Sequence, residues 1–127
     1  SGQVDLMFAN IVGVLQHIKT GKVRPVAVSS ARRAAVLPEV PSITDTYPEL
    51  DATGWTGLFA PAATSREIIA KINADANAVL GRADIRERFT EQGAEVVGGT
   101  PEQLAAFVRR ETALYAKVIK SSGIKID

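Results

Sequence analysis

The chain of 127 residues has no cysteine and only one histidine, His17. Without cysteine there can be no disulfide, no thiolate nucleophile and no cysteine-ligated metal. A single histidine also argues against a zinc site of the usual kind, so the sequence predicts neither a metal nor a cofactor. No carboxylate pair lies near His17 in the sequence, so we interpret it as a structural or surface residue rather than a catalytic one.

An excess of charge of one sign is also missing, as are long apolar runs. Fifteen basic residues stand against fourteen acidic ones. This balance argues against a nucleic-acid partner and against a polybasic membrane patch. No apolar run approaches the roughly 20 residues that a membrane-spanning helix needs. The chain begins at Ser1-Gly2 without a charged n-region or an apolar h-region, so we expect no signal peptide within it.

Catalytic motifs are absent too. The serines do not form a nucleophile elbow. Gly98-Gly99-Thr100 lacks the lysine and the glycine spacing of a phosphate-binding loop, and we interpret it as the turn before the last helix. Arg32-Arg33 and Arg109-Arg110 could meet an anion, but solvated surface is the favoured interpretation. The sequence therefore predicts that the protein is not an enzyme.

The most informative stretch is residues 54–61, a short apolar run that ends at Pro61. A helix over residues 65–80 is predicted directly after it, because Thr64 and Glu67 have the spacing of a capping box. Apolar strands that lead straight into helices are typical of parallel sheets covered on both faces. Such sheets bind ligands beside the carboxyl ends of their strands. The pattern predicts an α/β protein.

The first 29 residues predict a βαβ unit. Residues 4–9 have the pattern of a buried strand, Asn10 is a suitable N-cap, and Gly21 stands where a helix should end. Residues 23–29 form the second predicted strand, and the two strands are expected to lie parallel. The inner face of the helix between them is predicted from helical spacing: Ile11, Val14, Leu15 and Ile18.

Residues 30–53 form a proline-rich connection with, at most, a short helix near Ser42–Tyr47. Connections of this length are uncommon inside one compact domain, so we interpret it as a passage between two domains. After the strand at residues 55–60 and the helix that follows, Asp84 and Glu87 predict a second capping box.

The carboxyl-terminal residues predict the end of that short helix at Gly93, a brief strand at 95–97 and a last helix that starts at Thr100-Pro101. The inner face of the last helix is predicted to contain Leu104, Val108, Glu111, Tyr115 and either Val118 or Ile119.

Seven short blocks of sequence follow one another in an order that is unlikely to arise by chance. They are residues 2–8, 21–24, 27–33, 37–42, 54–62, 92–95 and 98–103. Through these blocks, and nearly end to end, the chain resembles the carboxyl-terminal part of the tripartite tricarboxylate transporter receptors, also called Bug-type periplasmic solute-binding proteins. Members of that family carry a signal peptide and roughly another half of sequence before the matching part, and that half holds their main carboxylate-binding loops.

The resemblance implies an α/β, periplasmic-binding-protein-like (type II) fold, of which this chain is a part. Family members have two lobes joined by crossing strands, with a small carboxylate in the cleft between them. Residues 1–53 would be the carboxyl-terminal part of the second lobe and the crossing. Residues 54–127 would be the returning part of the first lobe. The resemblance also implies a periplasmic location.

The resemblance places candidate ligand-binding residues in two segments. Asn10 fills the polar position that the family has after the strand ending at Phe8-Ala9, beside helix N–H groups suited to an anion. The alternative is that Asn10 only caps the helix, and Phe8 could line the cleft or fill the core. Trp55 and Thr56 fall at the return to the first lobe, where Trp55 is either a packing or hinge residue or a pocket wall.

The predicted function is that of a fragment of an extracytoplasmic receptor, which captures a di- or tricarboxylate for a tripartite-type membrane transporter without catalysis. Its implied partners are the carboxylate and the transporter subunits. The alternative is a non-catalytic α/β oligomerisation or interaction module without a working ligand site. Two-stranded sheets are marginal alone. We therefore expect a partner chain, either a missing amino-terminal fragment or a second copy in a homodimer or exchanged assembly.

Overall fold

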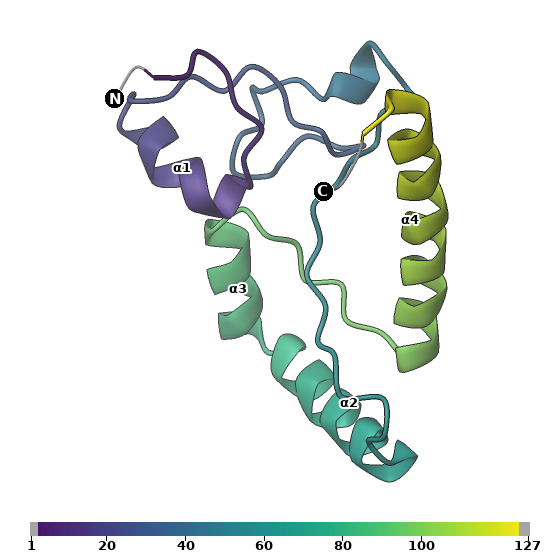
Figure 1. Cartoon of the computed structure of the whole chain (residues 1–127). Coiled ribbons are helices and arrows are strands. Elements are labelled where there is room, and N and C mark those ends of the chain that lie inside the picture. Colours follow the sequence, from purple (N-terminus) through teal and green to yellow (C-terminus); the bar gives the residue numbers. More distant parts are fainter. Residues whose placement is uncertain (1–2, 125–127) are drawn as a thin grey trace. The chain divides into compact units, whose positions relative to one another are not determined.

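The computed structural model describes residues 3–124, and its regular elements in that range are helices (Figure 1). The elements are α1 (Ile11–Lys19), the short 3-10 helix η1 (Ile43–Asp45), α2 (Arg66–Leu80), α3 (Ala83–Glu91) and α4 (Pro101–Ser122). The chain divides into two compact units. Unit 1 contains Ser1–Thr56 and Leu80–Val96, and unit 2 contains Gly57–Val79 and Val97–Asp127. The predicted lobe boundary after residue 53 concerns a longer receptor and stays a prediction.

Helix α1 forms as the sequence predicts. The Asn10 side-chain oxygen accepts a hydrogen bond from the backbone N–H of Val12 at 3.2 Å, which satisfies one of the free donors at the helix start. At the other end, Gly21 follows the helix with a φ of +70°. Leu15 is buried on the inner face, and Ile11 and Ile18 pack beside it.

The proline-rich connection contributes much of the core of unit 1. Its interpretation as a passage between two domains of a longer receptor stays a prediction. The buried apolar residues of this unit are Leu15, Val28, Leu37 and Val40. Two of them, Leu37 and Val40, each directly precede a proline of the connection, Pro38 and Pro41. The prolines prevent a long element, but these two apolar side chains still pack in the core with Leu15 of α1. Helix η1 forms within the range predicted for a short helix, and the Ser42 hydroxyl caps it.

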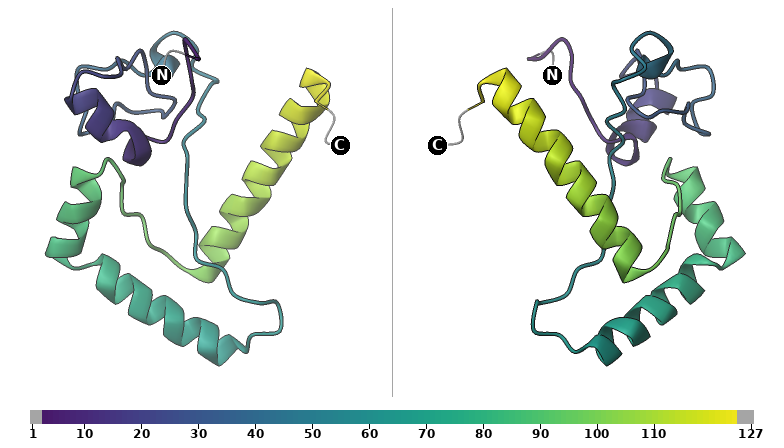
Figure 2. Two further views of the ribbon diagram at one scale, coloured as in Figure 1. Left: turned by 60° about the vertical axis from the view of Figure 1, so that its left-hand side comes forward. Right: turned by 90° about the vertical axis from the view of Figure 1, so that its right-hand side faces the viewer.

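The predicted strands do not form among the described residues. They were expected at residues 4–9, 23–29, 55–60 and 95–97. The β-type pairing in the described residues is an isolated parallel bridge between Val28 and Ser42. In Figure 2 the segments before α1 and before α2 run as plain coil in both views. Leu6 and Phe8 are 71% and 88% exposed. A strand needs neighbours that satisfy its backbone, and these segments have no such ladder within the described chain.

Helix α3 differs from its prediction at its first turn. Arg82 occupies the N-cap position without a side-chain capping bond, so the expected capping box of Asp84 and Glu87 is wrong. Asp84 instead pairs with the Arg82 guanidinium at 2.9 and 3.0 Å, and this contact lowers the pKa of its carboxyl. The predicted end at Gly93 is confirmed by a φ of +82°. A Cβ at Gly93 would lie 2.5 Å from Ile11, so glycine also permits close packing against α1.

In unit 2 the start of α2 is one residue later than predicted. The hydroxyl of Ser65, rather than that of Thr64, accepts a hydrogen bond from a helix N–H, that of Ile68 at 3.4 Å. Helix α4 has a complete capping box: the Thr100 hydroxyl accepts from the Gln103 N–H, and the Gln103 side chain accepts from the Thr100 N–H.

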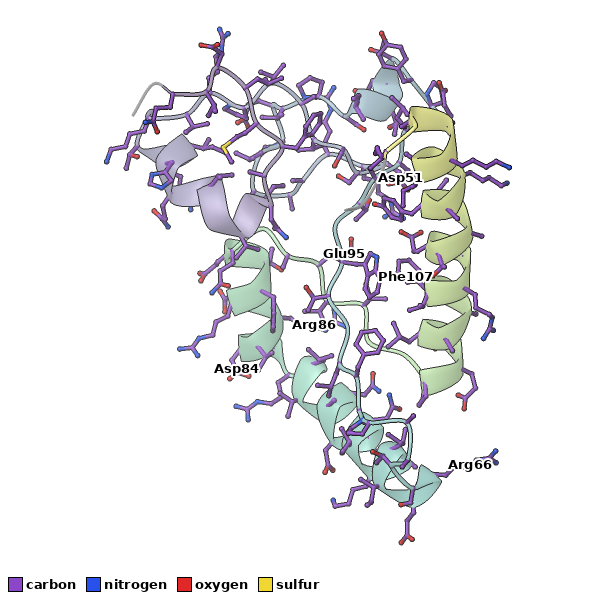
Figure 3. All side chains as sticks on the ribbon, viewed as in Figure 1. Asp51, Arg66, Asp84, Arg86, Glu95 and Phe107 are labelled. Carbon is purple, nitrogen blue, oxygen red and sulfur yellow. The ribbon has the colours of Figure 1, made fainter. Side chains whose placement is uncertain are left out.

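The predicted inner face of α4 is half-buried only over its first turns. Leu104, Val108 and Glu111 are partly covered. The residues of its later turns are exposed: Tyr115 by 47%, Val118 by 44% and Ile119 by 39%. Phe107, which is not among the predicted inner-face residues, is half-buried (Figure 3). The central carbon of the Arg110 guanidinium lies 5.1 Å from the centroid of its ring.

Two asparagines of α2 hold the turn that precedes α4. The Gly99 N–H donates to the Asn77 side-chain oxygen at 2.9 Å, and the Asn77 amide donates back to the Gly99 carbonyl at 2.9 Å. The Asn73 amide donates to the same carbonyl, also at 2.9 Å. Gly98 and Gly99 have φ values of +69° and +117°, a conformation that favours glycine. Residues 98–100 lead directly into α4, and Thr100 is its N-cap.

Candidate functional site

The two segments that carry the predicted ligand-binding residues meet in unit 1. A Cβ placed on Gly54 would lie 3.8 Å from the Asn10 side-chain nitrogen. Gly54 directly precedes Trp55 and Thr56, so these residues follow immediately after the point of contact. The fold of unit 1 therefore brings the start of α1 and the 54–56 segment side by side.

The side-chain oxygen and the side-chain nitrogen of Asn10 have different surroundings. Its oxygen caps α1, so the capping role is established. Its nitrogen, a hydrogen-bond donor, faces Gly54. This nitrogen lies beside the N-terminus of α1, where the helix dipole favours negative charge. The role of Asn10 as a ligand contact stays a prediction.

The remaining candidate residues lie at the surface of unit 1. Phe8 is 88% exposed, so the suggestion that it fills a core is wrong for the described chain, while its role in lining a cleft stays a prediction. Ala9 and Thr56 are exposed as well. Trp55 is 41% exposed, and the roles predicted for it stay untested. All five candidates are uncharged, so they offer hydrogen bonds and apolar surface rather than an acid–base pair.

One surface hollow occurs in a different part of unit 1. It has a volume of about 210 Å³ and is lined by Ile85, Arg88, Phe89 and Gln92 of α3 and the residue after it. Small-molecule pockets usually have about 300–1,000 Å³. No candidate residue lines this hollow, so it does not mark the predicted site.

The described residues contain neither a metal-binding cluster nor a membrane-spanning helix. Within residues 3–124 there is no group of three or more histidine, aspartate or glutamate side chains that could hold a metal ion. Over the same range, no helix combines the length and the apolar character needed to cross a bilayer. The shifted pKa values that the structure shows, those of Asp84 and Glu102, belong to helix starts outside the candidate site.

The sequence of the whole chain identifies its family. Residues 1–124 match the family model of the tripartite tricarboxylate transporter family receptor. The chain belongs to this receptor family. The resemblance drawn from the seven sequence blocks is thereby confirmed, and the family is one of binding proteins rather than enzymes.

Curated relatives extend well beyond the matched part. The chain is 34% identical over 121 residues to the UPF0065 protein in the tcbD-tcbE intergenic region of Pseudomonas sp. (strain P51), a match that covers 94% of this chain and 36% of the relative. It is 34% identical over 126 residues to the protein BugT of Bordetella pertussis, covering 98% of this chain and 39% of the relative. The chain thus spans less than two-fifths of the length of these relatives.

Solved structures confirm the fold class. The structure of R. palustris Rpa4515 with adipate matches at a TM-score of 0.83 and 32% identity, covering 91% of this chain and 39% of that one. The structure of the periplasmic binding protein BugD matches at a TM-score of 0.79 and 30% identity, covering 88% of this chain and 38% of that one. The structure of a periplasmic transporter matches at a TM-score of 0.90 and 29% identity, covering 99% of this chain and 42% of that one. The receptor chain has part of an α/β, periplasmic-binding-protein-like fold.

Proposed function

We propose that this chain is part of a periplasmic solute-binding receptor that captures a small organic acid for a tripartite tricarboxylate-type membrane transporter. The observation that carries the proposal is the family match over residues 1–124. The ligand class is supported by the neighbour Rpa4515, whose structure contains adipate, a dicarboxylate. Residues 1–53 would belong to the second lobe of the receptor and residues 54–127 to the first, with lobe closure around the ligand.

The contacts around Asn10 support binding of a carboxylate. The Asn10 side-chain nitrogen would donate a hydrogen bond to a carboxylate oxygen, and the N-terminus of α1 would stabilise the negative charge. The rings of Phe8 and Trp55 would cover the aliphatic part of the acid, since ligand pockets combine apolar walls with a few well-placed polar groups. Ala9 and Thr56 would complete this side of the cleft.

The rest of the cleft would come from further polypeptide. The relatives are more than twice as long as this chain, and the segment before α1 exposes apolar side chains such as Leu6 and Phe8. An amino-terminal part of the receptor, or a second copy in a homodimer or exchanged assembly, would cover these segments. The full receptor would then present its ligand to the membrane subunits of the transporter.

Ligand-induced thermal stabilisation tests the proposal. A ligand that binds the folded state raises the melting temperature, so adipate and citrate are expected to raise it. The uncharged diol with the chain length of adipic acid is the matched control and should leave it unchanged. If a folded sample in which the rest of the cleft is present responds to neither acid, the alternative of an interaction module without a working ligand site is favoured.

A further inference from the structure

We infer that Ser29 is a positioning residue that holds the 53–56 segment of the candidate site through Ala52. This inference rests on the proposed function. The Ser29 hydroxyl donates a hydrogen bond to the Ala52 carbonyl at 3.0 Å, and the Ser29 carbonyl accepts one from the Ala52 N–H at 2.9 Å. Both backbone groups of Ala52 are therefore bound by one residue.

The Ser29 side chain supplies half of this pairing. Here one of the two bonds comes from the Ser29 side chain, so the pairing depends on that hydroxyl. The two residues that flank Ala52 also contact each other, since the Thr53 hydroxyl donates to the Asp51 carboxylate at 2.7 Å.

Ser29 can act as an anchor because its neighbours are themselves held. Val28 donates to the Pro41 carbonyl at 2.9 Å and accepts from the Ile43 N–H at 2.8 Å. On the other side of Ser29, the Ser30 carbonyl accepts from the Ser42 hydroxyl at 2.6 Å, and Ser42 is only 3% exposed. Residues 28–30 are thus hydrogen-bonded to residues 41–43, and Val28 belongs to the core of unit 1.

Ala52 affects the candidate site because it lies close to Gly54 in the sequence. Thr53 alone separates Ala52 from Gly54, the residue that faces the Asn10 side-chain nitrogen. Without the Ser29 hydroxyl, the Ala52 carbonyl loses this donor and the start of the 53–56 segment is held by one bond fewer. The position of Gly54 and Trp55 relative to Asn10 should then become less well defined.

Three variants of the full chain test this role. Ser29→Ala removes the hydroxyl, and Ser29→Thr keeps it. Ser30→Ala is the matched control, since the Ser30 hydroxyl bonds locally to the Arg32 carbonyl at 2.7 Å. The first readout is the exchange rate of the Ala52 amide hydrogen. The second is the fluorescence of Trp55, the single tryptophan of the chain.

Ser29→Ala should raise Ala52 amide exchange about fivefold, the change expected for the loss of one neutral hydrogen bond. It should also shift the Trp55 emission, whereas Ser29→Thr and Ser30→Ala should resemble the parent. The inference is overturned if Ser29→Ala leaves both readouts unchanged. It is equally overturned if Ser30→Ala produces the same changes, because the effect would then be a general loosening of unit 1.

Adipate affinity, measured by calorimetry, separates this inference from the proposed function. Ser29→Ala should weaken adipate binding several-fold relative to the parent and to Ser30→Ala, and Ser29→Thr should restore it. Unchanged affinity together with a mobile Ala52 would show that the contact serves stability and not the site. If the parent itself does not bind adipate, the proposed function fails, while exchange and fluorescence still decide whether Ser29 positions the segment.

Discussion

At the scale of single residues, Asn10 has two roles that substitutions can separate. Its oxygen caps α1, and its nitrogen faces Gly54. Aspartate keeps an oxygen acceptor for the Val12 N–H and adds negative charge that the helix N-terminus favours. Aspartate lacks the donor, however, and would repel a carboxylate. Alanine removes both functions at once.

We predict that Asn10→Ala lowers the free energy of unfolding by about 1 kcal/mol, the usual value of an N-cap. Asn10→Asp should retain the stability of the parent but lose adipate binding. Chemical denaturation measures the first effect and calorimetry the second. If Asn10→Asp binds adipate as well as the parent does, Asn10 only caps the helix.

Glu102, in the first turn of α4, is predicted to make stability depend on pH. Its own backbone N–H, and then the Thr100 hydroxyl, hydrogen-bond its carboxylate and lower its pKa. A carboxyl whose pKa is lower in the folded state stabilises that state above the pKa of an ordinary glutamate, about 4.3. The contribution is lost as the pH falls through the lowered value. Denaturation from neutral to acidic pH should show this loss, and Glu102→Gln, which cannot ionise, should show a smaller one.

At the scale of elements, α2 and the start of α4 are joined by side chains that reach the backbone of a turn. Asn77 binds both the N–H and the carbonyl of Gly99, whereas Asn73 binds only the carbonyl. A Cβ on Gly98 would lie 2.7 Å from the Asn77 oxygen, so the turn and the asparagine fit closely. This contact connects residues that lie far apart in the sequence of unit 2.

We predict that Asn77→Ala destabilises the chain by about 3 kcal/mol, because three hydrogen bonds of about 1 kcal/mol each are lost, two with Gly99 and one with the Asn73 carbonyl. Asn73→Ala is the matched control and should cost about a third as much, since its side chain makes one such bond. Chemical denaturation of the two variants provides the comparison. Equal losses would contradict the assignment of Asn77 as the main contact of the turn.

At the scale of the whole molecule, few of the described residues are buried: they are Leu15, Val28, Leu37, Val40 and Ser42. The exposed surface includes large apolar side chains before α1 and before α2, such as Leu6 at 71% and Leu58 at 71%. Exposed apolar patches of this kind mark interaction surfaces.

We predict that the isolated chain associates with itself as its concentration rises, because association covers these apolar side chains. Leu6→Lys and Leu58→Lys should weaken the association, while Gln16→Lys, at an exposed position of α1, should not. Size-exclusion chromatography with light scattering measures the mass. A well-folded monomer over the whole concentration range would count against the prediction.

What the sequence determined by itself is the set of local features. The range of α1, the range of α2 to within one residue and the start of α4 were predictable because each depends on neighbours within a turn: Asn10 and Thr100 as caps, Gly21 as a terminator, and apolar residues at helical spacing. Family membership was also readable from the sequence, since the blocks follow one another in order. One local feature was not predictable. Thr64 and Ser65 are adjacent and both carry a hydroxyl that could cap α2, and the structure shows that Ser65 is the one that contacts the helix start.

The tertiary structure alone decided whatever depends on partners distant in the sequence. An apolar run predicts a strand only if another strand is available to pair with it, and residues 4–9 and 55–60 have none in the described chain. Of the candidate site, the residues could be nominated from sequence, but the approach of Gly54 to Asn10 could not. The Ser29 contact with Ala52 was equally invisible, because a serine hydroxyl carries no signal of which distant carbonyl it will bind. Hydrogen bonds between distant segments exist only after the chain has folded, and for that reason they leave no periodic pattern in the sequence.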